Sequence, residues 1–391
     1  MIKIDTPQDF NTNNSGNNSF YKFNNCEFNV QVTGSAALLE CEIVDCHFKE
    51  TVSFKINFGD KVIFKKCHFF EDVNFSHSIF DGKAEFIDCI FHQNVRFNDS
   101  YFKGKARFYQ SKFREQINFN NAKFDDLADF WNVVFRRSTI FYKTDFLGTV
   151  VFSSAEFLDN VLFTYTLIDK LIIFRGTIFN KGLDLSLAIV TGKISIFDIR
   201  IENYSSVENP EDDDLYEDYV TSSALICDKN KRETFRILKY QSSSQGDIIY
   251  SLTFSALEIK SYQDSLHRDI YKKKKWWKSQ DYIILILNNI SNKHGKSWSR
   301  GILFTLGAGL IFFYLSLLST YKYNFGCPNL TRADLVSNFG NFFISLAPTH
   351  KFDYLEKEGL GPFFYMWDFI GRIFVAYGIY QTIQAFRKFK A

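Results

Sequence analysis

The chain has 391 residues, with 46 Lys and Arg against 44 Asp and Glu, and a formal net charge of +2. A net charge this close to zero provides no general attraction for a polyanion, so we expect no nucleic-acid partner. The length exceeds what one domain usually needs, and the 46 phenylalanines are concentrated in the N-terminal half and in the last hundred residues. These values favour a chain of at least two parts.

The first segment, residues 1–20, reads MIKIDTPQDFNTNNSGNNSF and is mostly polar. It lacks the apolar stretch of a signal peptide, so we expect a flexible N-terminal tail without an export signal. The repetitive part that follows is therefore expected in the cytoplasm.

From Phe64 to Phe163 a phenylalanine recurs at alternating spacings of five and six residues, and a small or β-branched residue often stands two positions earlier. Side chains two residues apart point to the same side of a strand, whereas this alternation matches no face of a helix. Each unit thus provides one large and one small inward side chain, and four units make a square coil with a period of 22 residues. One inward ladder at this period consists of Phe64, Phe86, Phe108, Phe130, Phe152 and Phe174.

Units such as AEFID, VRFND, ARFYQ and INFNN resemble those of the pentapeptide-repeat family, whose units have a central Leu or Phe and a small residue two positions earlier. The resemblance implies an all-β, right-handed quadrilateral β-helix, expected over residues 21–204. The sixth residue of every second unit departs from the family's form and is expected to widen alternate corners. Some members are described as acidic duplex mimics that occupy gyrase, and this chain lacks the acidic surface that such mimicry needs, which leaves a gyrase-directed DNA mimic as a less favoured alternative.

The cysteines of the repeat, Cys46, Cys67 and Cys89, occupy the small-residue position, so we expect buried, reduced thiols. No Cys-x-x-Cys or Cys/His spacing points to a metal. No nucleophile elbow, phosphate-binding loop or other catalytic pattern occurs, so we expect neither an enzyme nor a cofactor.

After the repeat, residues 205–232 include ENPEDDDLYEDY and are expected to form an exposed acidic linker. Residues 233–299 are expected to form a helical connector. It begins with a hairpin of helices at 233–241 and 247–275, more suited to packing or oligomerisation than to ligand binding. The apolar residues 282–290, YIILILNNI, are too few to span a bilayer and are expected to lie along its inner surface.

The last part, residues 300–391, is expected to be a transmembrane hairpin. Residues 301–321 contain no charged side chain, and residues 362–386 form a second apolar stretch of similar length. Lys and Arg precede the first stretch and follow the second. This distribution predicts that both ends of the transmembrane hairpin face the cytoplasm. The location expected from this pattern is the bacterial inner membrane, crossed more than once.

Between the two stretches, the apolar segment 333–352 has the length of a half-span followed by a turn, as in a re-entrant pore loop. In the second stretch, Asp368 and Arg372 are spaced i, i+4 and are able to pair; an unpaired charge is costly in a bilayer, so we expect an interhelical or water-facing gate. The alternative for this pair is an outer interfacial position. The candidates for the pore or gate are Ser345, Pro348, Thr349, His350, Asp368 and Arg372.

The order of these segments, with ETFRILK, HGKSWSRGIL and GRIFVAYGIYQTIQAFRK, is similar to membrane-bound pentapeptide-repeat proteins that carry a C-terminal ion-channel-like region. The resemblance implies an oligomer, four copies by analogy with two-span channels, that conducts ions under the influence of a protein or ligand on the cytoplasmic solenoid. The chain has no TVGYG filter, so potassium selectivity is not implied. The alternative from another class is a non-conducting, membrane-tethered interaction scaffold.

Overall fold

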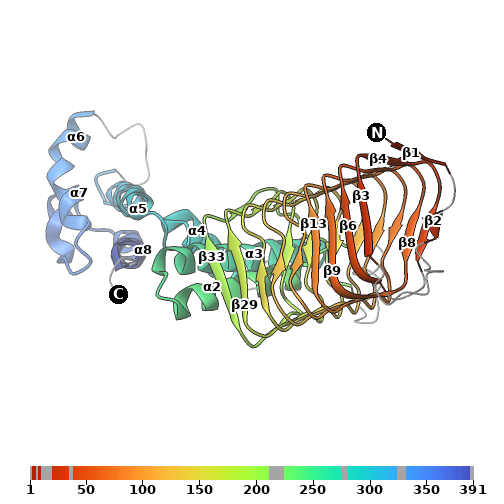
Figure 1. Cartoon of the computed structure of the whole chain (residues 1–391). Coiled ribbons are helices and arrows are strands. Elements are labelled where there is room, and N and C mark those ends of the chain that lie inside the picture. The colour runs from red at the N-terminus through yellow and green to blue at the C-terminus, as the bar shows by residue number, and fades with distance from the viewer. Residues whose placement is uncertain are drawn as a thin grey trace. The chain divides into compact units, whose positions relative to one another are not determined.

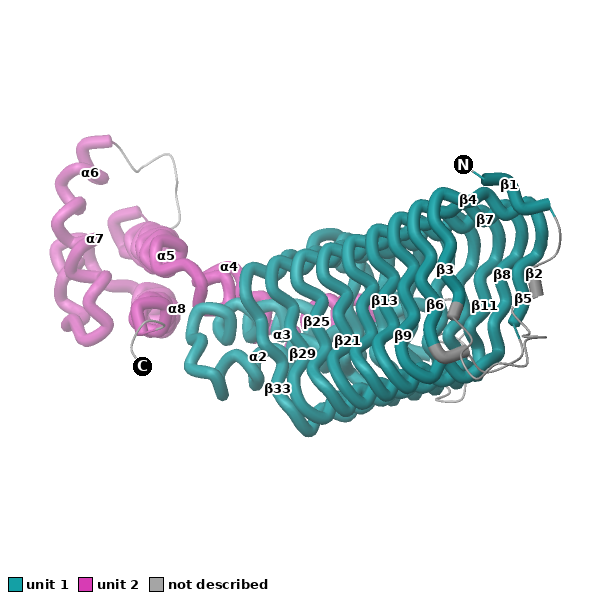
Figure 2. The backbone as a smooth tube through the Cα atoms, viewed as in Figure 1, with its two compact units in different colours: residues 1–262 teal, residues 263–391 magenta. Residues whose placement is uncertain are grey.

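The computed structural model divides the chain into two compact units, residues 1–262 and 263–391 (Figures 1 and 2). The residues described are 2–5, 8–9, 20–34, 38–210, 224–273, 280–323 and 332–387.

Unit 1 is a parallel β-solenoid with four faces, in which each strand pairs with the equivalent strand of the next coil. The first face contains β1 (Ile2–Ile4), β4 (Cys26–Phe28), β7 (His47–Phe48), β10 (His68–Phe69), β14 (Ile90–Phe91), β18 (Lys112–Phe113), β22 (Val134–Phe135), β26 (Glu156–Phe157), β30 (Ile178–Phe179) and β34 (Arg200–Ile201). The second contains β2 (Gln8–Asp9), β5 (Val32–Gly34), β8 (Val52–Phe54), β11 (Val73–Asn74), β15 (Val95–Arg96), β19 (Ile117–Asn118), β23 (Thr139–Ile140), β27 (Val161–Leu162) and β31 (Leu183–Asp184).

The remaining two faces form one 15-stranded sheet, because β9 (Asn57–Lys65) is long enough to belong to both. The third face continues from β9 through β12 (Ile79–Phe80), β16 (Tyr101–Phe102), β20 (Lys123–Phe124), β24 (Asp145–Phe146), β28 (Leu167–Ile168) and β32 (Ile189–Val190). The fourth contains β3 (Phe20–Asn24), β6 (Leu38–Val44), β13 (Lys83–Ile87), β17 (Ala106–Arg107), β21 (Ala128–Asp129), β25 (Thr149–Val151), β29 (Leu171–Arg175) and β33 (Lys193–Phe197).

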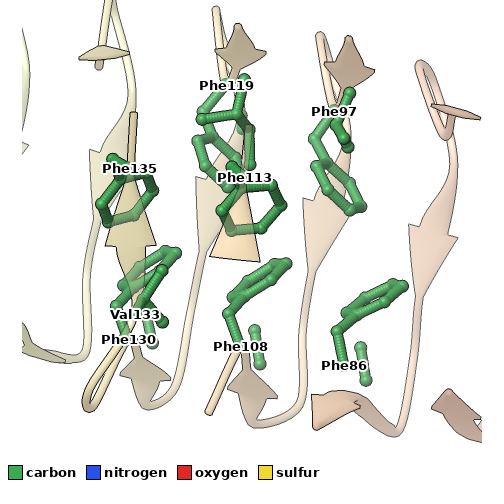
Figure 3. Packing of buried hydrophobic residues seen from close by; sticks show 14 of the residues in the cluster. Phe86, Phe97, Phe108, Phe113, Phe119, Phe130, Val133 and Phe135 are labelled. Atoms are coloured by element: carbon green, nitrogen blue, oxygen red, sulfur yellow. The ribbon is translucent and has the colours of Figure 1, made fainter. Parts of the chain in front are cut away.

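The core of the solenoid is a set of stacked phenylalanine ladders (Figure 3). The ring of Phe108 lies 5.2 Å from that of Phe86 and 4.9 Å from that of Phe130, nearly parallel to both. The small partners follow the same period, since Ala106 pairs with Ala128. The predicted coil of 22 residues and its buried ladder are confirmed.

Within the N-terminal segment predicted as a flexible tail, residues 2–4 and 8–9 form strands, while residues 10–19 lie outside the described part of the chain. Strand β1 pairs with β4 and strand β2 pairs with β5, so both belong to the solenoid. The reason is that β1 and β2 extend the first two faces by one strand and satisfy backbone groups of the next coil, such as the bond from Asn29 N to Ile4 O.

A helical hairpin, α2 (Asp228–Ser244) and α3 (Ile248–Lys273), covers part of the C-terminal end of the solenoid. Thr234 Oγ1 accepts a hydrogen bond from Leu185 N at 2.9 Å, and Gln245 Nε2 donates to Ile194 O at 2.6 Å. These bonds satisfy backbone groups that would otherwise pair with a further coil. The hairpin was predicted as a packing element, and within unit 1 it packs on the last coil.

The start of α2 lies five residues before the predicted position, inside the segment predicted to be an acidic linker. Asp228 is buried and accepts a hydrogen bond from Ser206 Oγ at 2.6 Å, which anchors the first turn to the solenoid. Ala224 is also attached, since its carbonyl accepts a bond from Asn160 Nδ2 at 3.0 Å. Most of the acidic run, residues 211–223, and the basic residues 274–279 lie outside the described part of the chain.

Unit 2 is helical. It consists of α4 (Gln280–Asn292), α5 (Trp298–Leu318), α6 (Arg332–Ser337), α7 (Phe339–Ser345), the 3₁₀ helix η4 (Phe352–Glu358) and α8 (Pro362–Arg387). Helices α5 and α8 pack closely on each other, and α4 packs on both. Of the described helices, α5 is long and apolar enough to cross a membrane, and 33% of its most apolar segment is buried within the protein. Helix α8, the second predicted span, is longer but does not reach the same apolar character, because it includes Asp368 and Arg372.

Candidate functional site

The centre of the candidate site is Asp368, a buried carboxylate on α8 that accepts three hydrogen bonds. Arg372 Nε, one turn further along α8, donates to Oδ2 at 2.7 Å. Oδ1 accepts from His350 Nε2 at 2.9 Å and from Tyr354 Oη at 2.8 Å. These four residues are called the Asp368 cluster below. The predicted pairing of Asp368 with Arg372 is confirmed, and its role as a pore or gate stays a prediction.

His350 contributes both ring nitrogens to this arrangement. Its Nδ1 faces the carbonyl oxygen of Ala347, and its Nε2 faces the Asp368 carboxylate. Both partners carry acceptor oxygens, and through these two contacts His350 ties the turn after α7 to α8.

One further contact covers the cluster. The Arg372 guanidinium lies 3.9 Å above the ring of Phe352, which covers its face in a cation–π contact. Burial, followed by the negative charge of Asp368, raises the pKa of Tyr354, so its phenol stays protonated and keeps donating. Asp368 is therefore held as a fully paired carboxylate.

The space around the cluster is nearly filled. A cavity of about 10 Å³ remains between α5, α7 and α8, lined among others by Gly309, Ser345 and Gly371. This is close to the smallest volume that holds one water molecule. The cluster therefore lies against packed side chains of its own chain, where it fastens α8 to the segment that precedes it.

The other predicted residues lie beside the cluster without joining it. Ser345, near the end of α7, donates its hydroxyl to the carbonyl of Phe342 at 2.7 Å. Pro348 is half-buried and Thr349 is exposed in the turn that carries His350. Of the six candidates, the structure brings together His350, Asp368 and Arg372.

Sequence reasoning missed Tyr354 and the partner of His350. His350 and Tyr354 lie 18 and 14 residues before Asp368, a separation that no local periodicity connects. The available signal was the spacing of His350 and Tyr354, four residues apart and close to helical spacing, in a segment otherwise interpreted as a turn.

A second buried polar cluster, also missed, connects α4 to α8. Asn288 Oδ1 accepts hydrogen bonds from Tyr377 Oη at 2.7 Å and from Gln381 Nε2 at 2.8 Å. Asn292 Nδ2 donates to both the side chain and the backbone carbonyl of Gln381. The segment predicted to lie along a membrane surface is thus fastened to α8 by its amide side chains.

The solenoid core residues have a structural role. The six phenylalanines of the predicted ladder are all buried, and within the described residues no group of His, Cys, Asp and Glu is arranged to hold a metal ion. The six cysteines there, including Cys46, Cys67 and Cys89, are buried free thiols, as predicted for the three in the repeat.

Comparison with known proteins bears on the solenoid alone. The family model described as pentapeptide repeats (9 copies) matches residues 54–100 and 97–145. No curated protein and no solved structure matches the chain. The matched residues form the central coils, where the phenylalanine ladder is most regular. Residues 54–145 of the solenoid therefore belong to the pentapeptide-repeat family.

Proposed function

We propose that the protein is an ion-channel-like membrane protein, in which unit 2 inserts in the bilayer and the pentapeptide-repeat solenoid stays in the cytoplasm as a sensor or interaction scaffold. The observation that supports insertion is the distribution of side chains in unit 2. Leu303 and Ile311 on α5, and Phe369 and Ile373 on α8, are all more than half exposed. Such a surface suits lipid and is costly in water.

The polar side chains of unit 2 support the same proposal. Asp368, Asn292 and Gln381 are buried, and each is hydrogen-bonded within the unit. Polar groups inside and apolar groups outside are what a bilayer requires of its helices. Under this proposal α8 is the second span, since the charges that lower its apolar character face protein and not lipid.

A pore requires several copies, because one pair of helices encloses no conduit; four copies are proposed by analogy with two-span channels. The Asp368 cluster is then the gate element. It fixes the segment around His350 to α8, and its opening would release that segment. A partner or ligand on the solenoid would bias the pore if it bound one arrangement of the connector more tightly than the other.

A second candidate is a membrane-tethered scaffold that conducts nothing. It is favoured by the nearly filled cavity at the Asp368 cluster, where all three hydrogen bonds of Asp368 come from its own chain. In that case the cluster only holds the fold of unit 2 together.

Ion conductance of the purified full-length protein in planar bilayers tests the proposal. A channel gives discrete current steps, and Arg372→Leu, which leaves the buried Asp368 carboxylate without its cation, should change current or oligomer size more than the double variant Asp368→Leu with Arg372→Leu. Lys351→Leu, an exposed neighbour, is the control. An oligomer of unchanged size without current in any variant would reject the channel in favour of the scaffold.

A further inference from the structure

Strand β32 is the last strand of its face, and two backbone acceptors at this strand receive no hydrogen bond from the described residues. On this face each coil accepts two bonds from the next: Leu167 N donates to Thr144 O and Asp169 N to Phe146 O, and one coil later Ile189 N donates to Thr166 O and Thr191 N to Ile168 O. The equivalent acceptors in the last coil are the carbonyls of Ala188 and Val190. Neither has a hydrogen-bond partner among the described residues.

The capping helix α2 leaves this edge open. Thr234 of α2 bonds to the solenoid beside β31, and Gln245, the residue after α2, bonds to it at β33. Between α2 and the edge of β32 lies a groove of about 710 Å³, and its lining includes Ala188, Val190, Ile237 and Tyr240. These two carbonyls, which no described residue pairs, thus lie at the side of a groove whose floor is apolar and whose wall also carries Glu233, Arg236 and Lys239.

The floor of the groove is the end of the hydrophobic core. Val190 is the last member of the inward column that contains Phe124, Phe146 and Ile168, and it is half-buried where these are fully buried. Ala188 occupies the small position two residues earlier. In every earlier coil these two positions are covered by the strand that follows.

We infer that β32 binds an extended segment of a partner protein, which adds to the sheet as its next parallel strand. The segment must provide two backbone N–H donors on alternate residues, with a small and then a large apolar side chain two positions apart that point onto Ala188 and Val190. This is strand addition to an open sheet edge, in which the backbone provides affinity and alternate side chains provide specificity. The binding site is independent of whether unit 2 conducts ions.

The probe is a synthetic peptide with the sequence of residues 142–149, YKTDFLGT, which pairs in this way inside the solenoid. There the amides of Asp145 and Leu147 donate to the coil below, while Thr144 and Phe146 point inward. The fluorescently labelled peptide should bind the full-length protein. N-methylation of the two donor amides should weaken binding by about tenfold or more, since two hydrogen bonds are lost.

Two variants locate the binding. Val190→Lys should abolish it by placing a charge on the groove floor, and Tyr240→Ala, at an exposed side chain of the groove wall, should weaken it without threatening the fold. Tyr271→Ala is the matched control, since Tyr271 is also an exposed tyrosine but does not line the groove. The inference would be overturned if the N-methylated peptide bound as tightly as the unmodified peptide. It would also be overturned if the Val190→Lys and Tyr240→Ala variants bound the peptide as tightly as the parent protein. A smaller oligomer of the Val190→Lys variant would also overturn it, because it would show that a second copy of the chain already occupies the edge.

Discussion

Each inward pair of the solenoid contains a large side chain that packs and a small one that, where it is Ser, Thr or Cys, can also donate a hydrogen bond. The phenylalanine fills the coil and stacks on its equivalents, as Phe108 does between Phe86 and Phe130. The small residue of an intervening unit often bonds the coil before it: Ser111 Oγ donates to Phe86 O at 2.8 Å. Thr144 donates in the same way to a carbonyl of the preceding coil. Ser, Thr and Cys at this position thus combine a small side chain with a donor hydrogen, whereas Ala and Val fill it without one.

The first prediction concerns the stacked ring of Phe108. Phe108→Ala should lower the free energy of unfolding by about 3–5 kcal/mol, because it removes a buried ring between two coils and leaves a cavity. Urea denaturation of the variant measures this, with the exposed change Lys105→Ala as its control. Similar costs for the two changes would contradict the ladder.

The second prediction concerns the buried thiol of Cys46. Burial raises its pKa to about 12, so the folded state holds the thiol neutral over a range where the unfolded chain ionises near 9.0. The stability contributed by this group is complete below pH 9 and is lost as the pH rises towards 12. Cys46→Ser, which keeps a small donor in place, should therefore lose less stability than the parent between pH 8 and pH 11. An identical loss in both proteins would show that Cys46 does not contribute.

At the scale of elements, the alternation of five- and six-residue units is explained by two kinds of corner. A left-handed residue, with φ between 51° and 59° except at glycine, occurs in each five-residue step. At Gln110 it is the third residue of a turn closed by Ser111 N and Phe108 O at 3.2 Å. Six-residue steps of the regular repeat contain no such residue; their extra residue makes the corner without a left-handed turn. The left-handed positions in the regular repeat are Lys66, His77, Asp88, Asp99, Gln110, Asn121, Asn132, Lys143, Ser154, Tyr165 and Gly176.

The third prediction follows from these corners. Asn tolerates the left-handed conformation better than other residues, and a β-branched side chain tolerates it least. Gln110→Asn should raise the free energy of unfolding by about 0.5–1 kcal/mol, whereas Gln110→Val should lower it by at least as much. Thermal unfolding of the two variants decides this, and a gain in stability with Val would exclude the explanation.

In unit 2, α5 and α8 approach closely through a reciprocal arrangement of glycine and threonine. A Cβ atom at Gly301 would lie 2.5 Å from Thr382 Oγ1, and one at Gly378 would lie 2.4 Å from Thr305 Oγ1. Each threonine also donates to the carbonyl of the glycine four residues before it on its own helix. Small residues at such a crossing allow the backbones to meet, as in membrane helices.

The fourth prediction tests this crossing. Gly378→Leu should destabilise unit 2 by about 1–3 kcal/mol, because the added side chain has no room against α5. Gly307→Leu is the matched control, since a Cβ at Gly307 on α5 meets nothing within 4 Å. Cross-linking yield between cysteines placed on α5 and α8 in detergent measures the packing; equal yields for both variants would contradict the close approach.

At the scale of the whole molecule, the charges of the solenoid are paired along its stack. Arg107 bonds to Glu85 at 3.1 Å, and Arg137 bonds to Glu115 at 3.0 Å, each pair joining neighbouring coils. Exposed pairs of this kind add little stability. Each pair sets opposite charges against one another on the surface of neighbouring coils.

The fifth prediction concerns membrane topology. Under the proposed function, Lys275 and Lys388, both outside the described residues, lie on the cytoplasmic side, and Glu356 and Glu358 of η4 lie on the other. Single cysteines at these positions should react with an impermeant reagent in intact cells only at 356 and 358. Labelling at position 275 in intact cells would reverse the assignment.

The sequence by itself determined the solenoid, because its information is local and repeated. Side chains alternate in direction along a strand, which determines the inward residues. A constant period of 22 residues then brings residues one coil apart, such as Phe86 and Phe108, into contact. The same reasoning predicted that Asp368 pairs with Arg372, since residues four apart on a helix are neighbours.

Only the tertiary structure decided what surrounds these elements. His350 and Tyr354 reach Asp368 because α7, η4 and α8 fold against one another, and Gln381 finds Asn288 across 93 residues. The bonds of α2 at one edge of the last coil, and the open edge at Val190, have the same origin. A hydrogen bond between distant segments depends on the packing of everything between them, and no periodicity in the chain encodes it.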